Sequence, residues 1–184
     1  MRGGDKVTDF AEKEFRDIAK KVREAGGYDP ELILRVKNFK AQAPLEPGQS
    51  WESVVEMVNE AIKEVDDVCA SLEKLCKIHG VSLPTASVLL AARYPDRFAI
   101  IDRNMFEFFR QDSVYGSIKS IFEIPGDDEL GDLVKEAKEM FNKTSEIRQQ
   151  IYPTYLSVLS AIRDRTHLAD LREVESKIWK EARK

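Results

Sequence analysis

The segment Gly80–Ala86 reads Gly-Val-Ser-Leu-Pro-Thr-Ala and joins two stretches with a helical spacing of apolar residues. Gly80 is expected to end the first helix, because glycine adopts the left-handed conformation of a helix C-terminus without steric cost. Pro84 is expected to open the second helix, because proline at the first helical position loses no hydrogen bond. The N–H groups at the start of a helix can bind a phosphate. The hairpin is therefore a candidate anion site; a plain, well-capped helix connection has the same pattern.

Side chains around the hairpin extend this candidate site. Ser82 and Thr85 supply hydroxyl donors, and Lys77 or His79 could add positive charge. Pro84, in contrast, has no N–H to offer a phosphate.

A lone acid, Asp102, follows the four apolar residues Phe98–Ile101 and precedes a helical stripe of apolar residues. The four-residue run is too short for a helix and is expected to be buried. Aspartate is a favoured N-cap, so Asp102 can serve simply to bind the first N–H groups of the next helix. Arg103 and Asn104 fall in the first turn of that helix, where they either line a groove or meet water.

The hairpin and the acid together resemble the helix-hairpin-helix superfamily of DNA glycosylases. That motif has an apolar helix, a hairpin of the form Gly-Val-Gly-x-x-Thr-Ala, a second helix, and an aspartate near the start of a later helix. Here the hairpin is Gly80–Ala86 and the acid is Asp102, so the resemblance covers about 35 of the 184 residues. Ser82 departs from the motif's second glycine, and Pro84 stands where the lyase-active branch carries its Schiff-base lysine.

The resemblance implies an all-α, glycosylase-like protein of base excision repair that acts on duplex DNA. Binding is expected to be weak, because the hairpin offers only a few phosphate contacts. No cofactor is expected, and the cysteines and histidines have no convincing spacing for a metal cluster. Asp102 would stabilise the cationic sugar that develops as the glycosidic bond breaks, or would activate the attacking water. The target base would be rotated out of the duplex. Without the lysine amine, no Schiff base would form. The residues expected to contact the nucleic acid are Lys77, His79, Gly80, Val81, Ser82, Thr85, Arg103 and Asn104.

A second resemblance points to a divergent, uncharacterised branch. The ending from Leu171 to Trp179, together with the Pro-Asp-Arg-Phe-x-x-Ile-Asp stretch at 95–102, is similar to proteins whose chemistry is not established. The alternative to an enzyme is therefore a non-catalytic helix-hairpin-helix domain that binds nucleic acid or another protein. Trp51, Trp179 and the Phe106–Phe109 cluster are expected to be core residues rather than platforms for stacked bases.

Composition sets the outer bounds. A chain of 184 residues suffices for one domain or for two small lobes that share a cleft, and we treat 1–184 as one all-α domain with the motif at 72–93. A hydrophobic content of 42% and a charged content of 34% are typical of a soluble globule. The net charge of −4 counts against a dedicated nucleic-acid binder, although clustering of cations on one face matters more than the total.

No run of about 18 apolar residues exists, so neither a membrane span nor a membrane partner is expected. The first six residues are not followed by the apolar core of a signal peptide, so a cytoplasmic location is expected. Cys69 and Cys76 lie on one predicted helix, about 10 Å apart and too far for a disulfide. Both cysteines are expected to be buried, and two are too few for a four-cysteine iron–sulfur loop.

Helical periodicity predicts the elements that position these residues. Helices are expected over about 8–25, from Asp29-Pro30 onward, over 51–76 with a break near Asp66-Asp67, around 130–141, and at the C-terminal end. Turns are expected near 114–116 and 124–126, and Pro153 is expected in a first turn. Arg35, Lys37 and Lys40 form a basic outer face, which is either a solvated surface or a phosphate contact.

Overall fold

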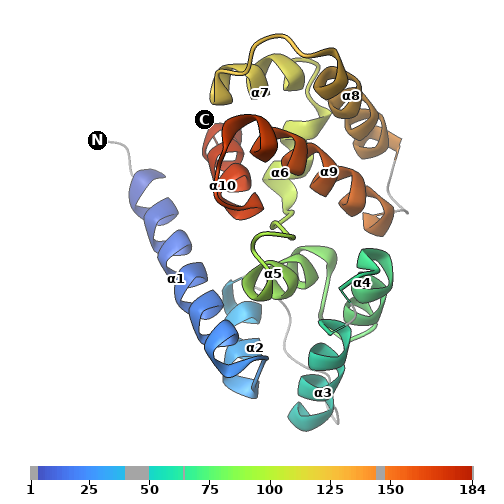
Figure 1. The fold of residues 1–184 in the computed structure, drawn as a ribbon. Coiled ribbons are helices and arrows are strands. Elements are labelled where there is room, and N and C mark those ends of the chain that lie inside the picture. The colour runs from blue at the N-terminus through green and yellow to red at the C-terminus, as the bar shows by residue number, and fades with distance from the viewer. Residues whose placement is uncertain (1–3, 40–49, 64, 144–147, 184) are drawn as a thin grey trace. The chain divides into compact units, whose positions relative to one another are not determined.

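The computed structural model describes residues 4–39, 50–63, 65–143 and 148–183. These residues form ten α-helices and contain no strand, which confirms the expected all-α class (Figure 1). No helix within these ranges is long and apolar enough to cross a membrane. The helices are α1 Gly4–Ala25, α2 Pro30–Phe39, α3 Trp51–Ala61, α4 Val68–Cys76, α5 Leu83–Arg93, α6 Arg103–Arg110, α7 Val114–Phe122, α8 Asp128–Lys143, α9 Arg148–Thr166 and α10 Leu171–Ala182.

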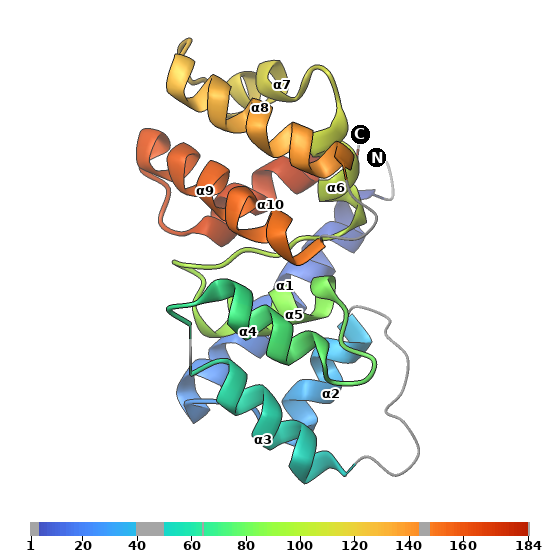
Figure 2. The ribbon, with the colours of Figure 1, turned by 90° about the vertical axis from the view of Figure 1, so that its right-hand side faces the viewer.

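The chain divides into two compact units, Met1–Tyr94 and Pro95–Lys184. The first unit contains α1 to α5, and the second contains α6 to α10 (Figure 2). The division falls at the Tyr94-Pro95 step, where proline cannot continue the preceding helix.

In the first unit, α5 is the central helix. It packs against α1, α2 and α4, and every residue from Thr85 to Ala92 is buried. Its sequence is apolar or small all the way round, as expected of a helix covered on every side. The hairpin that precedes α5 therefore leads directly into the core of this unit.

A polar clamp holds the turn between α1 and α2. Gly26 ends α1 with a φ of 76°, and Tyr28 follows. The Asn59 amide accepts from the Tyr28 N–H at 2.8 Å and donates to the Tyr28 carbonyl at 2.8 Å. A Cβ atom on Gly27 would lie 2.7 Å from Asn59 Oδ1, so this approach needs glycine. The Tyr28 hydroxyl also donates to the Leu89 carbonyl at 2.7 Å, which ties the turn to α5.

In the second unit, α8 and α10 pack against α9, and α6 contacts both α8 and α10. An aromatic cluster joins three of these helices. The ring of Phe109 in α6 stacks on Phe141 in α8 with centroids 5.0 Å apart, and it meets Tyr155 in α9 edge-on at 5.6 Å. This cluster fixes α6, whose first turn carries the candidate acid.

Several local expectations are confirmed. The break in the 51–76 run is present, because α3 ends at Ala61 and Asp67 caps α4 through the N–H of Ala70 at 2.9 Å. Asp29 likewise accepts the N–H of Leu32 at 2.8 Å in the first turn of α2.

The prediction of a basic outer face on α2 is wrong. Arg35 makes ion pairs with Glu14 at 2.7 Å and Asp17 at 2.9 Å, so its charge is used within the unit. Lys37 is only 3% exposed, and burial lowers the pKa of its amine. Lys40 lies outside the described residues. Helical periodicity predicts that Lys37 lies on the outer face, whereas the packing of the unit buries its side chain.

Three further expectations need correction. Cys69 is exposed and Cys76 half-buried, although both were expected inside. The segment 114–116 begins α7 rather than forming a turn. Pro153 lies inside α9 rather than in its first turn.

We predict that Asn59→Ala lowers the free energy of unfolding by about 1–3 kcal/mol, because the Tyr28 N–H and carbonyl both lose their partner. Urea denaturation followed by circular dichroism measures this change. Asn38→Ala, on the exposed face of α2, is the matched control and should change stability little. Equal stability of the two variants would contradict the role given to the clamp.

Candidate functional site

Asp102 is the N-cap of α6, as expected from the sequence. Its backbone is extended, with φ −138° and ψ −175°, and its carbonyl accepts the N–H of Phe106 at 3.0 Å. Its Oδ1 accepts the N–H groups of Asn104 at 3.0 Å and Met105 at 3.2 Å. The side chain therefore satisfies two of the N–H groups that the first turn of a helix leaves without partners.

The second carboxylate oxygen of Asp102 has a partner from a distant part of the sequence. Trp179 in α10 donates its indole N–H to Asp102 Oδ2 at 3.1 Å. The Arg183 guanidinium lies over the Trp179 ring, 4.6 Å from its centroid. Trp179 is half-buried rather than part of the closed core. The expectation that Trp179 is only a core residue is therefore wrong.

Two tyrosines hold the segment that leads to Asp102. Residues 98–101 are all buried, and they belong to neither a helix nor a strand. Tyr152 donates its hydroxyl to the Ala99 carbonyl at 2.6 Å, and Tyr155 donates to the Ile100 carbonyl at 2.8 Å. Burial raises the pKa of both tyrosines well above the usual value, so both remain neutral donors.

These tyrosines were missed from the sequence. The available signal was weak: two tyrosines three residues apart on an apolar helix must find hydroxyl partners when buried. Nothing local identifies carbonyls more than 50 residues earlier as those partners.

Two arginines of the second unit, Arg172 and Arg103, are the charged residues to consider with Asp102. Burial is the main cause that raises the pKa of Tyr155, and Tyr152 and the Asp102 carboxylate raise it further. Arg172 lowers it. Arg172 pairs with the buried Glu175 one turn along α10. Arg103 pairs with Glu107 at 2.8 Å, which raises the pKa of the guanidinium, and its side chain is 90% exposed. Asn104 is half-buried and supplies its backbone N–H to the cap.

The hairpin lies in the first unit, between α4 and α5. Lys77 is the C-cap of α4, Gly80 has a φ of 72°, and Ser82 is the extended N-cap residue of α5. The helix begins at Leu83, one residue earlier than expected, so Pro84 occupies its second position. The two helices and the left-handed glycine thus lie in the order that the sequence predicts.

Two hairpin residues are less available to a ligand than expected. The Val81 N–H donates to the Ile78 carbonyl at 3.0 Å, so it closes the turn itself. Thr85 is only 1% exposed and its hydroxyl is buried, so it cannot serve as a surface donor. Both residues lie in the hairpin as predicted, but the turn engages the Val81 N–H and packing buries the Thr85 hydroxyl.

The remaining hairpin residues are accessible to different degrees. Lys77 is exposed and pairs with Glu73 at 3.0 Å. His79 is exposed, and the Ser82 hydroxyl makes no cap hydrogen bond to α5. Gly80 is half-buried. The hairpin therefore offers a helix N-terminus with little net positive charge beside it.

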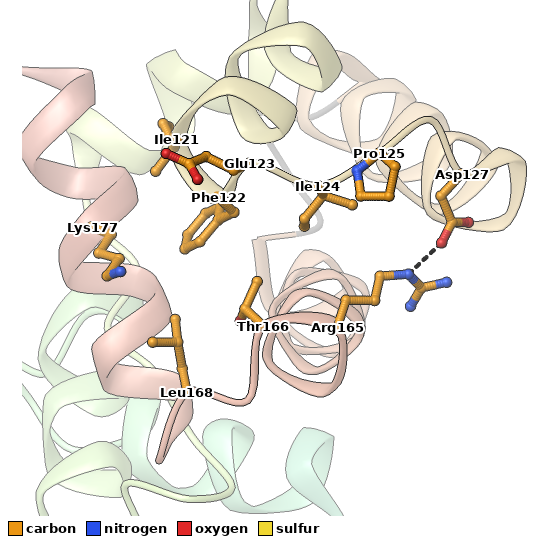
Figure 3. A pocket seen from close by; sticks show the side chains of 10 residues that line it. All are labelled: Ile121, Phe122, Glu123, Ile124, Pro125, Asp127, Arg165, Thr166, Leu168 and Lys177. Carbon is orange, nitrogen blue, oxygen red and sulfur yellow. Dashed lines mark hydrogen bonds and ion pairs between the residues drawn. The ribbon is translucent and has the colours of Figure 1, made fainter.

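A separate hollow of about 510 Å³ lies in the second unit, between the ends of α7 and α9 and the side of α10 (Figure 3). Its Arg165 pairs with Asp127 at 2.5 Å and Glu129 at 3.1 Å, which raises the pKa of the guanidinium. Lys177 Nζ lies 5.9 Å from the centre of the Phe122 ring. Because its arginine is already neutralised, the hollow has no concentrated charge, and we assign no chemistry to it.

Within the described part of the chain, no three His, Cys, Asp or Glu side chains are grouped so that they could hold a metal ion. Comparisons of the sequence with protein-family models and curated proteins, and of the fold with solved structures, found no match.

We predict that Asp102→Ala lowers the free energy of unfolding by about 1–3 kcal/mol, because the cap and the bond from Trp179 are both lost. Asp102→Asn should lose less, since an asparagine oxygen still caps the helix. Thermal unfolding of both variants and of the chain without substitutions tests this order of stabilities. A variant Asp102→Asn that is as unstable as Asp102→Ala would show that the cap contributes little.

Proposed function

We propose that this chain is a DNA-glycosylase-like protein of the helix-hairpin-helix superfamily, which hydrolyses the N-glycosidic bond of a damaged base and uses Asp102. The observation that supports this proposal best is the N-cap position of Asp102 on α6. It follows α4, a hairpin with a left-handed Gly80, and α5 in the chain order that the superfamily motif requires.

The proposed chemistry needs a fixed negative charge. As the bond between base and sugar breaks, positive charge develops on the sugar, and a carboxylate beside it lowers the barrier. Two backbone N–H groups and the Trp179 indole restrain the Asp102 carboxylate, so it would not have to reorganise during the reaction. The target base would be rotated out of the duplex to reach this group.

The proposed DNA contact is the start of α5. The first N–H groups of a helix have no partners within the helix and favour an anion. The Ser82 hydroxyl makes no cap bond there, and Pro84 has no N–H, so only a few contacts are available. Lys77 adds one charge that is shared with Glu73. This supports weak binding of duplex DNA through phosphates.

One observation favours a second candidate function, a non-catalytic helix-hairpin-helix domain that binds nucleic acid or another protein. The bonds that the Asp102 side chain accepts from the N–H groups of Asn104 and Met105 are also what a purely structural cap would make. The decisive experiment is incubation with duplexes that contain uracil, 8-oxoguanine, alkylated purines or mismatches, followed by scoring of abasic sites. Excision that Asp102→Asn abolishes supports the enzyme. Binding without excision on every duplex supports the second function. A chain that shows neither excision nor binding overturns the enzyme and leaves, of the second function, only the protein-binding form.

We predict that duplex binding weakens steeply with salt, and that Lys77→Glu weakens it further for every sequence and lowers the salt slope by about 1. Fluorescence anisotropy between low and moderate salt measures both effects. Lys143→Glu is the matched control, because Lys143 is also an exposed lysine paired with a glutamate one turn away, at 3.7 Å. If the two variants weaken binding equally, the effect is only one of net charge and the hairpin is not the contact.

We predict that any base excision proceeds without a covalent protein–DNA intermediate. A lyase of this superfamily attacks the sugar carbon with a lysine amine, and Pro84 occupies the position of that lysine. Borohydride trapping on a duplex that the protein excises should therefore give no adduct, while abasic sites still accumulate. A trapped adduct would show that another amine attacks the sugar.

A further inference from the structure

Asp102 Oδ1 is already oriented by the first turn of α6, but one cap does not fix the whole carboxylate. The torsion that turns a carboxylate group is broad, so the second oxygen needs its own partner to be held in place. Trp179, which lies 77 residues further along the chain, donates a hydrogen bond to Oδ2. A cap needs no such contact: Asp67 and Asp170 cap α4 and α10 through the N–H groups of Ala70 and Glu173.

Trp179 is itself held in a defined position. It follows Ile178, which is fully buried in the contact of α10 with the rest of the second unit. The Arg183 guanidinium, one helical turn later, covers the ring face at 4.6 Å from the centroid. Ring and guanidinium attract each other at this separation. The indole N–H is therefore aimed by α10 rather than free to follow the carboxylate.

The chemistry of the donor also fits a role beyond capping. An indole N–H can only donate, so it requires an accepting oxygen opposite it. It is also neutral, so this bond orients the carboxylate oxygen without adding a charge.

From these observations we infer that Trp179 is the positioning residue for the Asp102 carboxylate, so that α10 completes the site. This inference rests on the proposed function, because it assigns Trp179 a part in the same chemistry. Trp179 does not act on the substrate; it acts through Asp102. Neither its position in the sequence nor the hairpin motif assigns it this role.

The first test is spectroscopic and does not depend on activity. The chain has two tryptophans, so the ¹H–¹⁵N spectrum has two indole signals. Trp51 begins α3 in the first unit and serves as an internal reference. Asp102→Asn should move the Trp179 signal and leave that of Trp51 in place, because an amide cannot cap α6 and accept from the indole as a carboxylate does. An unmoved Trp179 signal would overturn the inference.

The second test is kinetic. Trp179→Phe keeps an aromatic ring beneath Arg183 and removes only the N–H donor and part of the ring. Single-turnover excision should slow by about 10- to 100-fold while the dissociation constant for the duplex stays the same, because only the orientation of the reacting group is lost. Trp51→Phe is the control and should change neither value.

These two tests separate the inference from the proposed function. If the chain without substitutions excises no base, the proposed function alone is overturned. The movement of the indole signal then still decides whether Trp179 holds the carboxylate. An active chain in which Trp179→Phe has an unchanged rate overturns the inference and leaves the proposed function standing. A variant Trp179→Phe that loses affinity and rate together, with a lowered melting temperature, has a merely structural role and also overturns it.

Discussion

The site depends on how the buried run 98–101 obtains hydrogen bonds. These residues lie outside the helices and so lack the regular hydrogen bonds of a helix, and buried carbonyls without partners are costly. Tyr152 and Tyr155 meet that need from α9, one turn apart, through two adjacent carbonyls. The chain can then leave the core at Asp102 with a set direction. Without these two hydroxyls, burial of the apolar run would leave the Ala99 and Ile100 carbonyls without these partners.

The same two tyrosines join the site to the core of the second unit. Tyr155 meets the ring of Phe109 in α6 as well as the Ile100 carbonyl. The segment before Asp102 and the helix after it therefore contact one side chain. Trp179 adds a third element, α10, which itself packs against α9. Helices α6 and α10 thus bond the Asp102 carboxylate itself, while α9 bonds the segment before it.

How much of this was visible in the sequence follows from the range of each interaction. Asp102 and Asp29 could be recognised as caps, because a cap bonds to N–H groups two or three residues away. The bond from Trp179 could not be recognised, because it depends on how α10 packs on α6. Lys37 and Thr85 show the same limit: their positions on a helix were clear, but burial by other elements decides what their polar atoms meet.

Asp102 and Asp127 differ in a way that bears on their roles. Both accept an N–H in the first turn of a helix, Asp127 from Leu130 at 2.9 Å. The other oxygen of Asp127 receives the Arg165 guanidinium, which lowers the pKa of that carboxyl and balances its charge. The other oxygen of Asp102 receives a neutral indole. The ion pair of Asp127 joins α8 to α9, whereas the bond from Trp179 joins the Asp102 carboxylate to α10 through a neutral donor. The two caps therefore connect their helices to the rest of the unit by different chemistry.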